Sequence, residues 1–195
     1  MAIEIEERFC VAAPIDVVWQ FVMDPQQVVT CMPGATVDEI EDDRAFLGSV
    51  KVKLGAVTTS YKGRVNFVEV DEEAHVIQMV AEGRETGGGT ARATVSSCLR
   101  SLADGQTEIM AQVQLDLTGR IVQVGRGMIQ GVSHQLFQQF AASTKERLEL
   151  PPGSVPEAAP AEPKAIRVLP VLFQTFWSAI LGFLRRIFGR PLSER

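Results

Sequence analysis

Histidine is scarce in this chain, and its scarcity limits the chemistry that the chain can perform. The 195 residues include only two histidines, His75 and His134, which we expect in a solvated turn and on a solvent-facing helix surface. No second histidine or carboxylate stands at ligand spacing to His134, so the sequence does not support a metal site. Ser133 and His134 would point about 100° apart on a helix and cannot form a nucleophile–base pair. We therefore expect no catalytic residue.

Cysteine is also scarce, and the first residues do not have the pattern of a leader sequence. Cys10, Cys31 and Cys98 form an odd, widely spaced set with no CxxC pair, which favours free thiols in a reducing compartment. The first seven residues alternate and are acidic, so they do not read as a signal peptide. Both observations predict a cytoplasmic protein.

Glycine-rich segments give no convincing nucleotide site. Gly125 to Gly131 resembles a dinucleotide-binding pattern but lacks a βαβ context, so we expect close packing or mobility where a helix begins. Gly87 to Gly89 has the composition of a flexible hairpin tip.

Basic residues are unevenly distributed. Of the 19 lysines and arginines, six lie in residues 164–195, where only one of the 24 acidic residues lies. The remainder is strongly acidic, which argues against a nucleic-acid partner. The same acidity would repel anionic lipid, so a membrane contact would depend on the basic C-terminal segment.

That C-terminal segment is the most hydrophobic part of the chain. A Pro/Ala-rich stretch, residues 151–166, predicts a flexible linker, and residues 167–190 predict an amphipathic helix. The uncharged run from Val168 to Leu184 would extend ~25 Å as a helix, short of a ~30 Å hydrocarbon core. We expect an in-plane membrane helix; a marginal span, or docking on the chain's own domain or on a partner, remain alternatives. The predicted membrane-binding residues are Phe173, Phe176, Trp177, Ile180, Phe183, Leu184, Arg185, Arg186, Ile187 and Phe188.

Residues 1–150 predict one α+β domain. Apolar and polar residues alternate through residues 3 to 118, which predicts antiparallel strands with one apolar face. Pro14 to Met23 and Pro25 to Cys31 predict two short helices, and residues 126–150 predict a long amphipathic helix. We therefore expect a curved antiparallel sheet of about seven strands that wraps around a long C-terminal helix.

A sheet that curves so strongly is expected to leave an apolar cavity against the helix, although a fully packed core is the alternative. Glycines such as Gly48, Gly63 and Gly83 would permit the bends. Tyr61, the single tyrosine, should point inward and need a hydrogen-bonding partner, either a ligand carbonyl or a protein group. From the alternation, the predicted ligand-binding residues are Phe46, Val50, Val52, Tyr61, Val65, Phe67, Met79, Val95, Ile109, Val113, Leu115, Met128, Val132, Leu136 and Phe140.

Three segments together resemble one known family. Val29 to Ala35, Gly48 to Val65 and Thr118 to Gln130 are similar, in family order, to the CoxG subunit family of carbon monoxide dehydrogenase. That family belongs to the START-like helix-grip (SRPBCC) superfamily. The resemblance covers roughly residues 1 to 150, and the hydrophobic tail after a Pro-rich linker also occurs in CoxG proteins.

The resemblance implies a non-catalytic accessory protein of an aerobic molybdenum carbon monoxide dehydrogenase. It further implies that a respiratory quinone, menaquinone, is bound non-covalently in the cavity, and that the protein links the enzyme to the cytoplasmic side of the cell membrane. Three alternatives remain open: a tethering adaptor without a ligand, an accessory protein of another molybdenum hydroxylase, and an enzyme, because other helix-grip proteins are cyclases and hydrolases.

Overall fold

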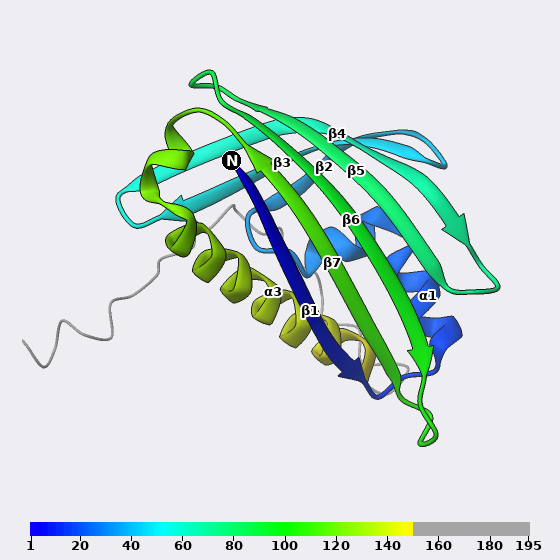
Figure 1. Ribbon diagram of the computed structural model, residues 1–195. Coiled ribbons are helices and arrows are strands. Elements are labelled where there is room, and N and C mark those ends of the chain that lie inside the picture. The colour runs from blue at the N-terminus through cyan, green and yellow to red at the C-terminus, as the bar shows by residue number, and fades with distance from the viewer. Residues whose placement is uncertain (150–195) are drawn as a thin grey trace, which may run out of the picture.

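The protein is described here by a computed structural model, in which residues 1–149 are placed. A single sheet wraps around the long helix α3, and two short helices pack near one end of the sheet (Figure 1). In chain order the elements are β1 (Ala2–Val11), α1 (Ile15–Val22), α2 (Pro25–Thr30), β2 (Ala35–Asp42), β3 (Ala45–Leu54), β4 (Val57–Asp71), β5 (Val76–Glu85), β6 (Thr90–Ser101), β7 (Thr107–Leu117), the 3-10 helix η1 (Arg120–Val124) and α3 (Arg126–Glu149). The predicted α+β helix-grip architecture is confirmed for these residues.

The sheet has seven strands in the order β1-β7-β6-β5-β4-β3-β2, and every pair is antiparallel. Strands β2 to β7 follow one another through short turns, while β1 pairs with β7. This arrangement brings the start of the domain beside its last strand and leaves β1 and β2 as the edges.

The two short helices begin where the sequence supplies suitable first-turn residues. Pro14 precedes α1 in an extended conformation, and Pro25 occupies the first turn of α2. The Asp24 carboxylate accepts hydrogen bonds from the backbone amides of Gln26 at 2.9 Å and Gln27 at 3.3 Å. It therefore caps α2 by satisfying two amides that have no partner within the helix.

Small residues meet across four strands where the sheet bends. Gly48, Gly63, Gly83 and Ala91 are register partners on β3 to β6. A Cβ atom added to Gly63 would lie 1.9 Å from the backbone oxygen of Glu82, which no side chain can tolerate. These positions therefore let neighbouring backbones approach closely, as expected for strands that curve sharply.

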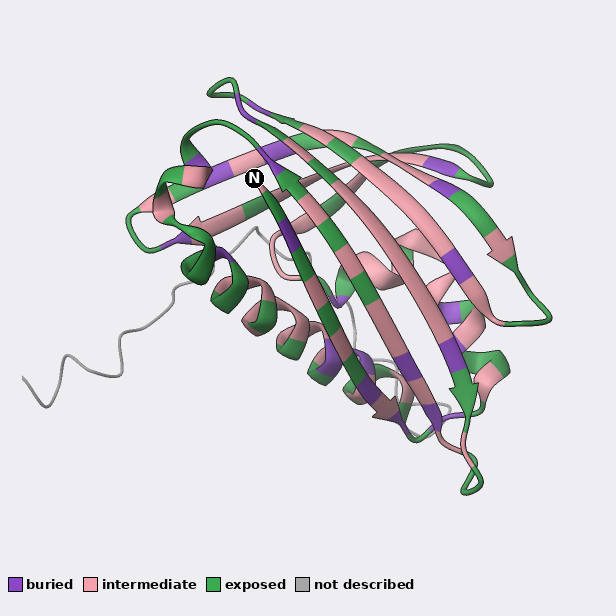
Figure 2. Ribbon diagram, in the orientation of Figure 1, coloured by how far each residue is buried: buried purple, intermediate pink, exposed green. Residues whose placement is uncertain are grey.

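Most buried hydrophobic residues among residues 1–149 fall into two clusters near opposite ends of the inner sheet face (Figure 2). Five are buried outside the clusters: Phe21, Cys31, Ala45, Phe67 and Ile77. The first cluster, next to α1 and the C-terminal part of α3, contains Phe9, Val11, Ala13, Val18, Leu99, Ile109 and Ala141. The second, next to η1 and the start of α3, contains Ile3, Leu54, Tyr61, Leu117, Ile121 and Ile129. Two clusters in place of one continuous core indicate that the middle of the inner face is less well covered.

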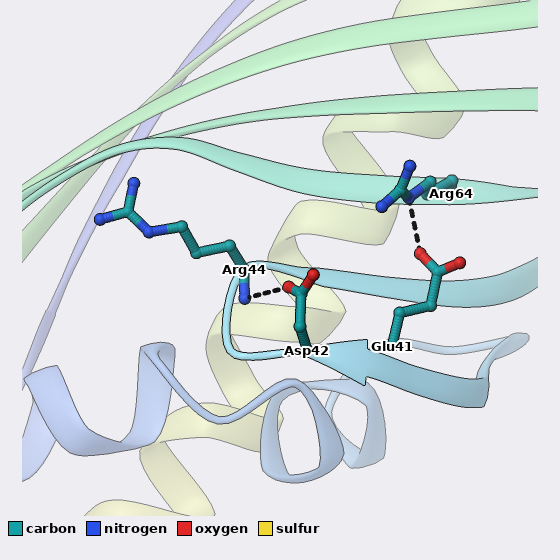
Figure 3. A network of polar contacts seen from close by, with 4 residues as sticks. All are labelled: Glu41, Asp42, Arg44 and Arg64. Carbon is teal, nitrogen blue, oxygen red and sulfur yellow. Dashed lines mark hydrogen bonds and ion pairs between the residues drawn. The ribbon is translucent and has the colours of Figure 1, made fainter.

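The β2–β3 corner is held by polar contacts at the edge of the sheet (Figure 3). The Arg64 Nε atom on β4 lies 2.6 Å from Glu41 Oε2 on β2. The backbone amide of Arg44 donates to Asp42 Oδ1 at 2.7 Å and closes the turn. Charged side chains along β2 also discourage pairing of this exposed edge with another strand.

The predicted linker, residues 151–166, and the predicted membrane helix, residues 167–190, lie outside the described residues. Each of the membrane-binding residues predicted above lies there too. Of the helices formed by residues 1–149, none combines the length and the apolar character needed to cross a bilayer.

Candidate functional site

The predicted ligand-binding residues lie on the inner face of the sheet and on α3, but they differ in exposure. Tyr61, Phe67 and Ile109 are buried. Eleven others are half-buried: Phe46, Val50, Val52, Val65, Met79, Val95, Val113, Leu115, Val132, Leu136 and Phe140. The intermediate exposure of so many inward-facing apolar side chains is the distinctive property of this face.

Half-buried residues fill most of two adjacent rows across the centre of the sheet. The first row, in register across β4 to β7, is Val65, Ala81, Ala93 and Leu115. The second row, two residues along the same strands, contains Met79, Val95 and Val113, and its β4 position is the buried Phe67. We call the seven half-buried residues of the two rows the central strip. It lies between the two buried clusters, and each of its members is half-buried, although Leu115 packs against the second cluster.

The prediction that Met128 faces the interior is wrong. Its side chain is 47% exposed, whereas the next residue, Ile129, is only 3% exposed. Met128 belongs to the first turn of α3, beside the β3–β4 turn at Gly55. Ile129 contacts the second cluster at this turn, while Val132 and Phe140 pack against the two clusters as predicted, so only the start of the helix departs from the prediction.

The outer face of the sheet has a groove of about 710 Å³ over β2 to β6. Its walls are largely charged: Lys62, Arg64, Arg84 and Arg92 oppose Asp38, Glu39 and Glu82. Two of these bases already form ion pairs, Arg64 with Glu41 and Arg92 with Glu82. Leu47, Gly83 and Ala91 leave apolar surface between these charges.

Three buried polar groups lie together near the second cluster, and we call them the Tyr61 cluster. Tyr61 and Thr59 project inward from β4, and Glu85 is the register partner of Tyr61 on β5. By hydrogen-bond geometry, the Tyr61 hydroxyl, the Thr59 hydroxyl and Glu85 Oε2 have no partner among residues 1–149, although the Thr59 hydroxyl is close enough to affect the pKa of Tyr61. The other carboxylate oxygen, Glu85 Oε1, has a long contact of 3.5 Å with the exposed guanidinium of Arg120. A buried polar atom without a partner costs ~1–3 kcal/mol, so three together call for an explanation.

The phenol of Tyr61 is neutral at physiological pH. Burial raises its pKa above the ordinary value of 10.0, the Thr59 hydroxyl partly opposes this, and the negative charge of Glu85 raises the pKa further. Deprotonation is therefore harder in the folded state, and the free energy of unfolding falls as the pH rises above 10. At neutral pH the hydroxyl can both donate and accept a hydrogen bond.

An ion pair that the alternation did not predict joins α3 to the sheet. Glu7 interrupts the inward-facing series Ile3, Ile5, Phe9 and Val11, and its carboxylate contacts Nδ1 of His134. The His134 side chain is 60% exposed, as predicted, yet its ring reaches β1. The position of Glu7, a charged residue within an apolar series, was the sequence signal from which this contact could have been found. His75, in the turn between β4 and β5, is partly covered by Trp19, and the centroids of the two rings are 5.2 Å apart.

Metal ligation has no support in this part of the molecule. In residues 1–149, no three side chains of histidine, cysteine, aspartate or glutamate come close enough to hold an ion. The three cysteines carry free thiols, as predicted.

Several solved structures belong to the same fold class as residues 1–149. A conserved protein from Geobacillus kaustophilus aligns with a TM-score of 0.69 at 16% identity, covering 75% of this chain and 95% of that one. The ZhuI aromatase/cyclase from Streptomyces sp. R1128 aligns with a TM-score of 0.58 at 15% identity, covering 76% and 94%. A START superfamily protein from Mycobacterium smegmatis gives 0.53 at 13% identity, covering 75% and 97%. At these identities the likeness concerns the fold alone.

The family is narrower than the class. The sequence profile of the CoxG subunit family of carbon monoxide dehydrogenase matches residues 8–149, and the chain belongs to that family. The resemblance seen in the sequence is thereby confirmed. No curated protein matches the chain.

Proposed function

We propose that this protein is a non-catalytic accessory protein of an aerobic molybdenum carbon monoxide dehydrogenase and that it carries a respiratory quinone, menaquinone, for that enzyme. Family membership supports the partner, because the family is named for a component of carbon monoxide dehydrogenase. A related molybdenum hydroxylase is the alternative partner, and a ligand-free adaptor is the alternative role.

The central strip is the observation that carries the proposed ligand. Its seven apolar or small side chains face the helix layer but stay half-buried. Apolar surface that is left partly exposed between two packed clusters is a preferred contact for an apolar molecule. A quinone ring with an isoprenoid chain is flat, apolar and elongated, so it matches a strip that crosses four strands.

We also propose that the protein is located on the cytoplasmic side of the cell membrane, and this location rests on the sequence beyond residue 149. An isoprenoid quinone is insoluble in water, so a soluble enzyme needs a carrier that visits the bilayer. The basic, aromatic segment from residue 167 to 190 supplies the membrane contact in this proposal, and residues 151–166 span up to ~50 Å if they are extended.

Ligand extraction tests the carrier role. The full chain, purified without added lipid from cells that make menaquinone, should release about one equivalent of quinone into organic solvent, detected by mass spectrometry. A protein purified in parallel from a strain unable to make quinone should take up added menaquinone. Repeated preparations that contain no quinone and take none up would leave only the adaptor role.

Vesicle flotation tests the membrane role. The full chain should float with vesicles that contain anionic lipid, and replacing Arg185 and Arg186 with glutamine should weaken flotation several-fold, because each base contributes ~1 kcal/mol near an anionic surface. The matched control is replacement of Lys51 and Lys53, two bases on β3, which should leave flotation unchanged. Equal flotation of all three proteins would contradict membrane binding through residues 167–190.

A further inference from the structure

The Tyr61 cluster lies next to the central strip on the same face of the sheet. Along β4, the only inward-facing position between Tyr61 and Val65 is Gly63, and on β5 Gly83 occupies the corresponding place between Glu85 and Ala81. Because neither glycine has a side chain, no side chain on these strands separates the cluster from the strip.

The cluster is closed from the other side by close backbone contacts. A Cβ atom on Gly119 would lie 2.6 Å from the Cα atom of Gly89, so the β5–β6 turn and the segment after β7 touch directly. A Cβ atom on Gly89 would also lie 2.8 Å from Glu85 Oε2. The Glu85 side chain is 5% exposed under this cover. Its free oxygen is therefore shielded from bulk water on that side.

The hydrogen-bonding capacities of the three groups define what they would accept. Within residues 1–149, each of the three has an unused atom. An ionised carboxylate oxygen only accepts hydrogen bonds, whereas the hydroxyls of Tyr61 and Thr59 both donate and accept. A ligand carbonyl could accept from the two hydroxyls but has no proton for Glu85. A ligand hydroxyl can donate to Glu85 and accept from Tyr61 at the same time.

We propose that the Tyr61 cluster is a hydrogen-bonding subsite for a ring hydroxyl, and that the protein consequently binds the hydroquinone form of its ligand more tightly than the quinone form. The inference rests on the proposed function, because it assigns a redox preference to that same quinone site. The carrier would then hold the reduced product of an enzyme that passes electrons to quinone, in preference to the oxidised substrate.

An anaerobic titration of the full chain tests the preference. The probe is 2,3-dimethyl-1,4-naphthoquinone, offered either oxidised or reduced by dithionite, and binding is followed by calorimetry. We expect a Kd about tenfold lower for the hydroquinone, which corresponds to ~1.4 kcal/mol. Glu85→Gln and Tyr61→Phe should each bring the ratio of the two dissociation constants towards one, chiefly by weakening hydroquinone binding.

Matched controls separate the subsite from general effects. Arg84→Gln changes the neighbouring residue on the outer face of the same strand and should leave the ratio unchanged. Thr59→Val is an independent variant in case one of the others does not fold, which a thermal unfolding curve of each protein reveals.

The outcomes are distinct. Equal dissociation constants for the two forms, or a preference unaffected by the variants at Tyr61, Thr59 and Glu85, would overturn the subsite while leaving the carrier role intact; a buried water would then account for the three polar groups. Binding of neither form would overturn the proposed function and the subsite with it.

Discussion

Replacing Gly63 with alanine should destabilise the folded domain by at least ~4 kcal/mol, in the range reserved for the most severe substitutions. The new methyl group would lie 1.9 Å from the backbone oxygen of Glu82 and 2.5 Å from the Cα atom of Gly83. Both obstacles are backbone atoms of the paired strand, so no side-chain movement relieves the clash. Urea unfolding followed by circular dichroism should show the loss as a much lower midpoint.

A second glycine in the same chain provides the control for that experiment. Gly131 lies inside α3, where an added Cβ atom would meet nothing within 4 Å. Gly131→Ala should therefore stabilise the domain by up to ~1 kcal/mol, since alanine favours the helix. An unchanged midpoint for Gly63→Ala would show that the sheet is not sharply bent at the Gly63–Gly83 contact.

The strands and their faces could be predicted because apolar and polar residues alternate in the sequence, and the exposure of the side chains follows that alternation. Val65 and Phe67 face inward, and Lys62 and Arg64 face outward, as a period of two requires. The long helix was also predictable in position, and only the residue that faces inward at its first turn was not. A stripe that repeats every four residues drifts around a helix with 3.6 residues per turn, so Met128 and Ile129 were equally good candidates at its first turn.

Contacts between distant segments were beyond the reach of the sequence. The alternation placed Tyr61 inside but said nothing of Glu85, its register partner on the next strand. Likewise, Glu7 contacts His134 across 127 positions of the chain. Both depend on register and on how the helix crosses the sheet, which hydrophobic periodicity does not specify.

The central strip links the fold to the proposed function. The curved sheet packs against α3 at both ends, where Ala141 and Ile129 of the helix join the two buried clusters (Figure 1). The side chains between the clusters include alanines at positions 81 and 93, which are too short to fill the space left by the curvature. The curvature of the sheet thus goes together with reduced burial at its centre.

Substituting Ala93 with tryptophan should abolish most quinone binding while the domain stays folded. Ala93 is at the centre of the strip, between Ala81 on β5 and Leu115 on β7. An indole there would occupy the surface that the ring is proposed to contact, and we expect occupancy after purification to fall about tenfold or more, a loss of at least ~1.4 kcal/mol.

Stability provides the second readout of this variant. If the strip is uncovered, the indole has room, and Ala93→Trp should change the free energy of unfolding by less than ~1 kcal/mol. Forcing the same side chain into a packed core would cost ~1–3 kcal/mol or more. Thr94→Trp, on the outer face of the same strand, is the matched control and should retain the ligand. Severe destabilisation by Ala93→Trp but not by Thr94→Trp would mean that the centre of the domain is solid, and an apolar ligand would then have no place between sheet and helix.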